Sequence, residues 1–214
     1  MNKPKPITAG WILFVIYCVG FVGLSLQVTK LYVVPLTWVN LLVTLIVLLM
    51  YHKKWSKEIS FALILVGAIG YFIEVVGVKT GLIFGYYQYG PTLGYALLDT
   101  PLMMAVNWII TIYITRQIAE MIAKDLFLIS VLASLLMIIL DYFIEPFAIQ
   151  YGLWRWNRGE VPIHNYIGWF VCGLIIHYLF LKSVKFPTNK LALPIYVIQL
   201  AFFMGLYFIK YKVF

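Results

Sequence analysis

The sequence predicts an all-α integral membrane protein, a polytopic bundle of about seven spanning helices. Of its 214 residues, 64% are hydrophobic and only 11% are charged, whereas a soluble domain carries about 25% charged residues. The apolar residues occur in runs close to the roughly 20 residues that a spanning helix needs. Most charged residues lie between these runs. These observations exclude an ordinary soluble domain.

Seven apolar runs have the length of a spanning helix, and they form one domain over residues 1–214. They are Trp11–Gln27, Leu31–Tyr51, Ser60–Val78, Pro101–Ile118, Leu126–Ala148, Asn165–Leu181 and Leu191–Ile209. The third and sixth runs also carry polar residues and several glycines. No signal-peptide cleavage pattern stands out at the N-terminus, so the first run is expected to be a retained helix.

The basic residues predict the orientation of the bundle. With the N-terminus inside, ten lie at cytoplasmic ends: Lys3, Lys5, Lys53, Lys54, Lys57, Arg116, Lys124, Lys182, Lys185 and Lys190. Six lie at outer ends: Lys30, Lys79, Arg155, Arg158, Lys210 and Lys212. Because basic residues favour cytoplasmic loops, we expect an N-in/C-out protein of a bacterial inner (cell) membrane. The net charge of +8 then follows from topology, and no nucleic-acid partner is expected.

Acidic residues from distant parts of the chain are expected at one depth, near the outer surface. They are Glu74, Asp99, Asp141 and Glu145. Arg155, His164 and Asn165 follow in the next connection and at the start of the sixth run. Ionisable groups at membrane depth usually face the bundle interior or a water-filled cavity. We therefore expect one polar pocket beneath the outer surface.

Asp141 and Glu145 are four residues apart in the stretch DYFIEPF, so they share one face of a helix. Two close carboxylates repel each other, and a low dielectric penalises the charged form of each. One of the two is therefore expected to stay protonated near neutral pH and to serve as a proton donor. The alternative is that the pair contacts Arg155 or a backbone amide and only holds helices together.

The stretch EVVGVKTGLIFGYYQYG, residues 74–90, joins the third and fourth runs. Its glycines at positions 77, 81 and 85 are typical of close helix packing. The connection is long for a helical bundle, and it contains Tyr86, Tyr87 and Tyr89. It could fold over the pocket as a lid or re-entrant segment, or its tyrosines could be interface anchors.

Other polar and aromatic residues have a structural interpretation, and some of them also have a functional one. Asn107 at membrane depth is expected to join helices through a hydrogen bond, or to line the pocket. Trp154 and Trp156 flank Arg155 and are either membrane-interface residues or aromatic walls around a cation. Farther from the acidic residues, His177 is expected to be a packed core histidine. Cys18 and Cys172 are expected to be free apolar packing residues.

Several functions are excluded or disfavoured by the same residues. A retinal-binding protein needs a buried lysine in the last helix, whereas Lys190 and Lys210 lie at the ends of the last run. A magnesium-dependent prenyltransferase needs a second acidic motif, which we do not find. No Cys/His zinc spacing exists, and we expect no metal site. A small-solute transporter, or a lipid-binding membrane protein, remains an alternative.

Three stretches together resemble the membrane carotenoid hydratase family, which includes bacterial carotenoid 1,2-hydratases and haloarchaeal bisanhydrobacterioruberin hydratases. They are EVVGVKTGLIFGYYQYG, LLDTPLMMAVNWII and DYFIEPFAIQYGLWRWNRGEVPIHNYIGWF, which span residues 74–170. The resemblance implies addition of water to the terminal double bond of an acyclic carotenoid, without a cofactor. The expected partners are a hydrophobic carotenoid, water, the lipid bilayer and other enzymes of the carotenoid pathway.

The resemblance and the residues together suggest roles for the pocket. Asp141 is the expected general acid, Glu145 tunes it or stabilises a cation, and Glu74 holds the water. The expected substrate-binding residues are Tyr86, Asp99, Asn107, Trp108, Trp154, Arg155, His164 and Asn165. A lycopene-type cyclase is the nearest alternative, because it also begins by protonating a terminal alkene.

Overall fold

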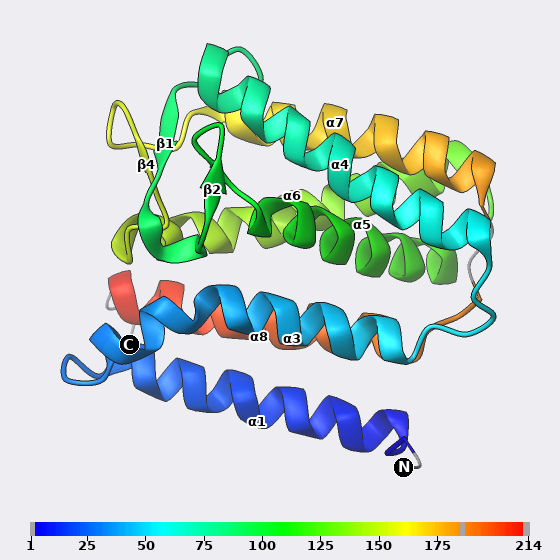
Figure 1. The fold of residues 1–214 in the computed structure, drawn as a ribbon, viewed down its shortest axis with the longest axis horizontal. Coiled ribbons are helices and arrows are strands. Elements are labelled where there is room, and N and C mark those ends of the chain that lie inside the picture. The colour runs from blue at the N-terminus through cyan, green and yellow to red at the C-terminus, as the bar shows by residue number, and fades with distance from the viewer. Residues whose placement is uncertain (1–2, 185–186, 212–214) are drawn as a thin grey trace.

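The computed structural model describes residues 3–184 and 187–211, which form a bundle of long helices (Figure 1). The helices are α1 (Pro6–Ser25), α2 (Lys30–Val33), α3 (Thr37–Met50), α4 (Lys57–Thr80), α5 (Met103–Ile122), α6 (Leu126–Gln150), α7 (Ile163–Ser183) and α8 (Ala192–Tyr211). Short 3-10 helices occur at η1 (Val34–Leu36) and η2 (Pro91–Leu93). The strands are β1 (Tyr87–Tyr89), β2 (Ala96–Leu97), β3 (Thr100–Pro101) and β4 (Trp154–Trp156).

Local sequence signals set where the helices begin and end. The side chains of Ser56 and Asp125 accept hydrogen bonds from backbone N–H groups in the first turns of α4 and α6, and such caps satisfy donors that the helix leaves free. At the other end of α4, Gly81 adopts a left-handed conformation with φ of 67°. Glycine pays no Cβ penalty there, so the chain turns toward β1.

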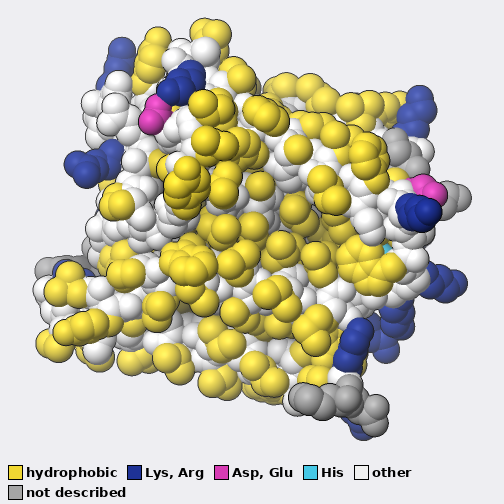
Figure 2. Space-filling view, viewed as in Figure 1, with side chains coloured by type: hydrophobic (Ala, Val, Ile, Leu, Met, Phe, Trp, Pro, Cys, Tyr) yellow, Lys and Arg dark blue, Asp and Glu magenta, His cyan; other side chains and the backbone are white. Residues whose placement is uncertain are grey.

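The helical membrane bundle predicted from the sequence is confirmed. Each of the seven predicted runs coincides with a helix, the second with the continuous segment Lys30–Met50. In the described residues, six helices are long and apolar enough to cross a membrane. Figure 2 shows a surface dominated by hydrophobic side chains along the bundle, with the lysines and arginines gathered toward its two ends. Lipid-facing helices require this distribution.

The remaining long helix, α5, is less apolar because it lies in the middle of the bundle. It packs against α3, α4, α6, α7 and α8. Arg116 on α5 is 2% exposed, and its guanidinium donates to the Glu120 carboxylate at 3.0 Å and to the Val184 carbonyl oxygen at 2.6 Å. The Arg116 guanidinium is therefore paired inside the protein and does not face lipid.

The connections divide between the two ends of the bundle as the sequence predicts. The Lys3 ammonium donates to the Met50 carbonyl oxygen at 2.8 Å, so the N-terminal segment lies beside the end of α3. The α5–α6 and α7–α8 connections lie at this same end, whereas the α4–α5 and α6–α7 connections lie at the opposite end (Figure 1). Lys185 and Lys212 fall outside the described residues, and the N-in/C-out orientation stays a prediction.

Candidate active site

Three carboxyl groups line one cavity near the end of the bundle that carries the α4–α5 and α6–α7 connections. Glu74 comes from α4, and Asp141 and Glu145 come from successive turns of α6. Their exposed fractions are 2%, 6% and 1%. The cavity has a volume of about 270 Å³, and most of the side chains around it are apolar. The i, i+4 spacing on α6 thus places both acids of that helix on the cavity face.

Glu74 is held by three neutral hydrogen-bond donors. One carboxylate oxygen accepts from the hydroxyls of Tyr87 at 2.6 Å and Tyr89 at 2.7 Å. The other oxygen accepts from the indole N–H of Trp108 at 3.0 Å. Hydrogen bonds donated to a carboxylate favour its ionised form.

Glu145 is held in a similar way by three other donors. One of its oxygens accepts from the indole N–H groups of Trp154 at 3.0 Å and Trp156 at 2.8 Å. The other oxygen accepts from the Asn165 amide at 3.2 Å. Both glutamates therefore accept hydrogen bonds only from neutral groups in the described residues. The donors are two hydroxyls and one indole N–H at Glu74, and three N–H groups at Glu145.

Asp141 receives less support than the two glutamates. The Asn165 amide nitrogen donates to it at 2.7 Å, and this same nitrogen donates to Glu145. Asn165 stands near the start of α7 and is 2% exposed, so it bridges two acids that lie on α6. Among the described hydrogen bonds, Asp141 accepts only this one.

A two-stranded antiparallel ladder supplies four of the donors. Strands β1 and β4 pair Tyr87 with Trp156 and Tyr89 with Trp154. Alternate side chains of a strand point to opposite faces, so these four aromatic residues face the cavity. Gln88 and Arg155 pair with each other and are exposed on the other face. Burial, and then the charge of Glu74, raise the pKa of Tyr87 and of Tyr89, so both phenols stay protonated donors.

The packing behind Glu74 depends on one small residue. A Cβ atom on Gly70 would lie 2.2 Å from the Trp108 ring. The absence of that atom lets the Trp108 indole lie against α4 and reach Glu74 one turn away. On its other side, Trp108 stacks on Trp169 with ring centroids 4.4 Å apart and planes at 11°. Trp108 is therefore fixed on both sides.

No basic side chain neutralises the three carboxyls within the described part of the chain. Its ion pairs are Lys79 with Asp99 and Arg116 with Glu120, and neither involves the cavity. The alternative of a structural ion pair between Arg155 and the acids on α6 is therefore wrong. The described Asp, Glu, His and Cys residues also form no cluster of three suited to a metal ion.

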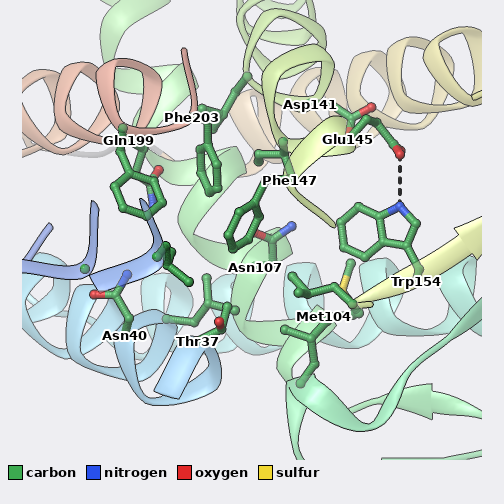
Figure 3. A pocket seen from close by; sticks show the side chains of 18 of the residues that line it. Thr37, Asn40, Met104, Asn107, Asp141, Glu145, Phe147, Trp154, Gln199 and Phe203 are labelled. Atoms are coloured by element: carbon green, nitrogen blue, oxygen red, sulfur yellow. Dashed lines mark hydrogen bonds between the residues drawn. The ribbon is translucent and has the colours of Figure 1, made fainter. Parts of the chain in front are cut away.

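A second polar group lies at the other end of the cavity. Figure 3 shows Asn40 and Gln199 on one side of the cavity, and Asp141, Glu145 and Trp154 on the other. Asn107, Phe147 and Phe203 lie between them (Figure 3). The cavity is thus lined mostly by apolar side chains, with polar residues at both ends and Asn107 between them.

The structure brings most of the sequence-predicted site residues to this cavity. Its lining includes Glu74, Asn107, Asp141, Glu145, Trp154 and Asn165, and Trp108 reaches it through Glu74. His177 lies apart, buried and hydrogen-bonded to Thr115 at 3.2 Å.

Four predicted binding residues do not reach the cavity: Tyr86, Asp99, Arg155 and His164. Asp99 follows Leu98 in the tight turn between β2 and β3, where both residues have positive φ, and its side chain pairs with Lys79 on the surface. The other three occupy outward-facing positions and are exposed. His164 directly precedes Asn165 on α7, and one helical step rotates it away from the cavity.

Several residues that the structure brings to the cavity were not among the predicted catalytic and substrate-binding residues. Tyr87, Tyr89 and Trp156 carried a signal, because Tyr-x-Tyr and Trp-x-Trp have the two-residue period of a strand. Asn40 and Gln199 carried only the weaker signal of an amide within an apolar run.

Comparisons with known proteins identify the family. Residues 36–213 match the family described as carotenoid biosynthesis protein. The bisanhydrobacterioruberin hydratase of Haloarcula japonica is 28% identical over 138 residues, covering 58% of this chain. The aligned region spans 45% of that relative's length, and no solved structure matches this chain. Because the family match covers most of the sequence, this chain belongs to the carotenoid biosynthesis protein family.

Proposed function

We propose that the protein is an enzyme that adds water to the terminal double bond of an acyclic carotenoid end group. One observation carries this proposal: three buried carboxyls, with no basic partner among the described residues, face an otherwise apolar cavity. Such a site combines a proton source with space for a hydrocarbon. Membership of the carotenoid biosynthesis family and the relative that is named a hydratase support it.

The cavity suits a hydrocarbon end group that arrives from the membrane. Its walls include Ile144, Phe147 and Phe203. Its lining also includes Val19 of α1 and Leu36 of η1, which are 66% and 55% exposed on the apolar surface. An acyclic carotenoid could therefore enter from lipid and place its end against the carboxyls.

In this mechanism Asp141 is the general acid. Glu74 and Glu145 each accept three hydrogen bonds from neutral donors, which favours their ionised forms. Asp141 accepts one such bond and lies one turn from Glu145. Of the three acids, Asp141 is thus the one on which a proton is best retained.

The first chemical step transfers this proton to the substrate. The π electrons of the alkene form a C–H bond at the less substituted carbon, and Asp141 becomes a carboxylate. The positive charge develops on the dimethyl-bearing carbon as a tertiary cation. The carboxylate of Glu145 and the nearby aromatic faces stabilise that charge.

The second step adds water to the cation. A water held near Glu74 by the hydroxyls of Tyr87 and Tyr89 forms the new C–O bond and gives its extra proton to Glu74. Return of that proton to Asp141 restores the enzyme. The net reaction joins one alkene and one water to give a tertiary alcohol, with no change in redox state.

Product mass after expression in a lycopene-producing bacterium tests this function. Hydration gives a product heavier than lycopene by one water for each end that reacts. Cyclisation would give an isomer of unchanged mass and would contradict the proposal. Unchanged lycopene, together with solute flux or lipid binding that depends on Glu74 and Asp141, would instead indicate a transporter or lipid-binding protein. An empty vector is the control for host enzymes.

A further inference from the structure

The cavity reaches the apolar outer surface of the bundle beside α1. Of the described residues that line the cavity, those that are also exposed are Ile16 and Val19 of α1 and Leu36 of η1. The other described lining residues are buried or partly buried. Because the exposed members come from α1 and η1 alone, we place the opening of the cavity between these two elements.

Two contacts between α1 and the α2–α3 segment bound this opening. On the side of the N-terminus, the hydroxyls of Tyr17 and Thr44 pair at 3.2 Å. On the opposite side, α1 lies against the end of α2, since a Cβ atom on Gly23 would lie 2.6 Å from the Val33 side chain. Because a helix rises 1.5 Å per residue, Tyr17 and Gly23 are about 9 Å apart along α1.

Between these two contacts, α1 leaves space on the side of α3. Gly20 lies in this part of α1 and lines the cavity. A Cβ atom on Gly20 would have one neighbour within 4 Å, a ring carbon of Phe202 on α8 at 3.7 Å, so no atom of α3 lies that close. Across the opening, Leu36 and Thr37 line the cavity. The Thr37 hydroxyl donates to the Val34 carbonyl oxygen at 2.7 Å, so it needs no partner in the opening.

The cavity is too small to enclose a whole carotenoid. Its volume is about 270 Å³, whereas pockets that hold drug-sized ligands have about 300–1,000 Å³. An end group fits in this space, and the rest of a long polyene must lie outside it. A conjugated chain is flat and about 4 Å thick, from the contact distance of carbon atoms. It can therefore pass through an opening about 9 Å long.

We propose that the opening framed by Val19, Gly20, Leu36 and Thr37 binds the polyene chain of the substrate next to its reacting end group. We call this opening the α1–α3 window. The inference rests on the proposed function and adds to it the place where the chain leaves the cavity for lipid. Gly20 then determines which chains fit, because a side chain at this position would narrow the window.

A narrowed window should discriminate between a long and a short ligand. Lycopene extends through the window, whereas the short terpene citronellene carries the same dimethyl alkene and fits inside the cavity. Binding of each to the purified full chain in detergent is measured at equilibrium by the ligand-induced rise in unfolding temperature. We expect Gly20→Leu to weaken lycopene binding about tenfold or more, and to leave citronellene binding within about twofold of wild type.

Leu36→Trp narrows the window from the other side, so failure of one variant to fold leaves the other available. Gly10→Leu is the matched control for Gly20→Leu: Gly10 also lies on α1, its Cβ would meet Leu191 at 3.7 Å, and it does not line the cavity. Leu31→Trp is the control for Leu36→Trp, because Leu31 is exposed on α2 and does not line the cavity. Both controls should bind the two ligands as wild type does.

Two results would overturn the inference. Wild-type lycopene affinity in both Gly20→Leu and Leu36→Trp would show that the chain leaves the cavity elsewhere. Equal loss of both ligands in these variants would show that the window has no role separate from the cavity. The outcome is separable from the proposed function. Selective loss of lycopene binding, with no hydrated product from the wild type, would contradict only the hydratase function. Hydration by the wild type, with lycopene affinity unchanged in both variants, would contradict only this inference.

Discussion

Tyr87 and Trp156 lie opposite each other in the β1–β4 ladder, with ring centroids 5.1 Å apart, yet they donate to different carboxylates. Tyr87 donates to Glu74 on α4, and Trp156 donates to Glu145 on α6. The ladder thus supplies hydrogen-bond donors to both glutamates and fixes the positions of their carboxyl groups. It also joins the α4–α5 and α6–α7 connections, so the site depends on their pairing as well as on the helices.

Removing the indole donors should impair catalysis more than folding. Trp154→Phe and Trp156→Phe each delete one N–H bond to Glu145 and keep most of the aromatic packing. A hydrogen bond to a charged group contributes about 1.5–3 kcal/mol, so we expect each variant to lower turnover about tenfold or more. Turnover of purified protein and the unfolding temperature are the two measurements.

Trp11→Phe is the matched control for these variants. Trp11 is 61% exposed on the surface of α1 and does not line the cavity, so its replacement should leave turnover unchanged. Wild-type turnover in Trp156→Phe would mean that the indole N–H does not serve the reaction.

Gly70→Ala should destabilise the protein by about 1–3 kcal/mol and reduce turnover, because overpacking forces neighbouring side chains from their positions. The new Cβ would lie 2.2 Å from Trp108 and would displace its bond to Glu74. Gly10→Ala is the control, since its Cβ would meet Leu191 at an ordinary 3.7 Å. Unfolding in a denaturing detergent reports the difference, and equal stability of the two variants would contradict this packing.

Asp99→Asn should leave turnover unchanged, although Asp99 is one of the acids that the sequence grouped with the pocket. Its side chain is 73% exposed and pairs with Lys79, and such surface ion pairs contribute about 0–1 kcal/mol. Asparagine also tolerates the positive φ of this turn. A large loss of turnover on this substitution would show that Asp99 reaches the substrate.

Alkaline pH should destabilise the fold partly through Tyr87. Burial, and then the charge of Glu74, raise its pKa above the ordinary value, so the native phenol keeps a proton that the unfolded chain loses above about pH 10. This contribution to stability is complete below pH 10 and falls by about 1.4 kcal/mol per pH unit above it. Unfolding measured at several alkaline pH values should show a shallower decline for Tyr87→Phe; identical slopes would contradict the buried phenol.

The helices were predictable because each is a long apolar run, and the pairing of Asp141 with Glu145 follows from helical periodicity alone. The β1–β4 ladder was not predictable in the same way. It joins residues about 70 positions apart, and local patterns carry no information about which strands pair. Its four inward-facing aromatic rings had a strand-like spacing, but their partners were visible only in three dimensions.

Rotation about helices and turns explains why some of the predicted binding residues do not line the cavity. His164 and Asn165 are neighbours in sequence, yet only Asn165 faces the acids. Similarly, Asp99 lies in the turn between β2 and β3, which directs its side chain to the surface. Asn40 and Gln199, in contrast, were not predicted as site residues but do line the cavity. Each lies in an apolar run, and only the folded bundle shows that both face the same cavity.

Proton transfer from Asp141 is the central claim, and turnover in deuterated water tests it most directly. Purified wild type and Asp141→Asn are each given an acyclic carotenoid, with Glu160→Gln, an exposed acid at the same end, as the control. We expect wild type and Glu160→Gln to form a tertiary alcohol with one deuterium on the adjacent carbon, and Asp141→Asn to form none while remaining folded. Wild-type yield of the labelled alcohol from Asp141→Asn would contradict the account.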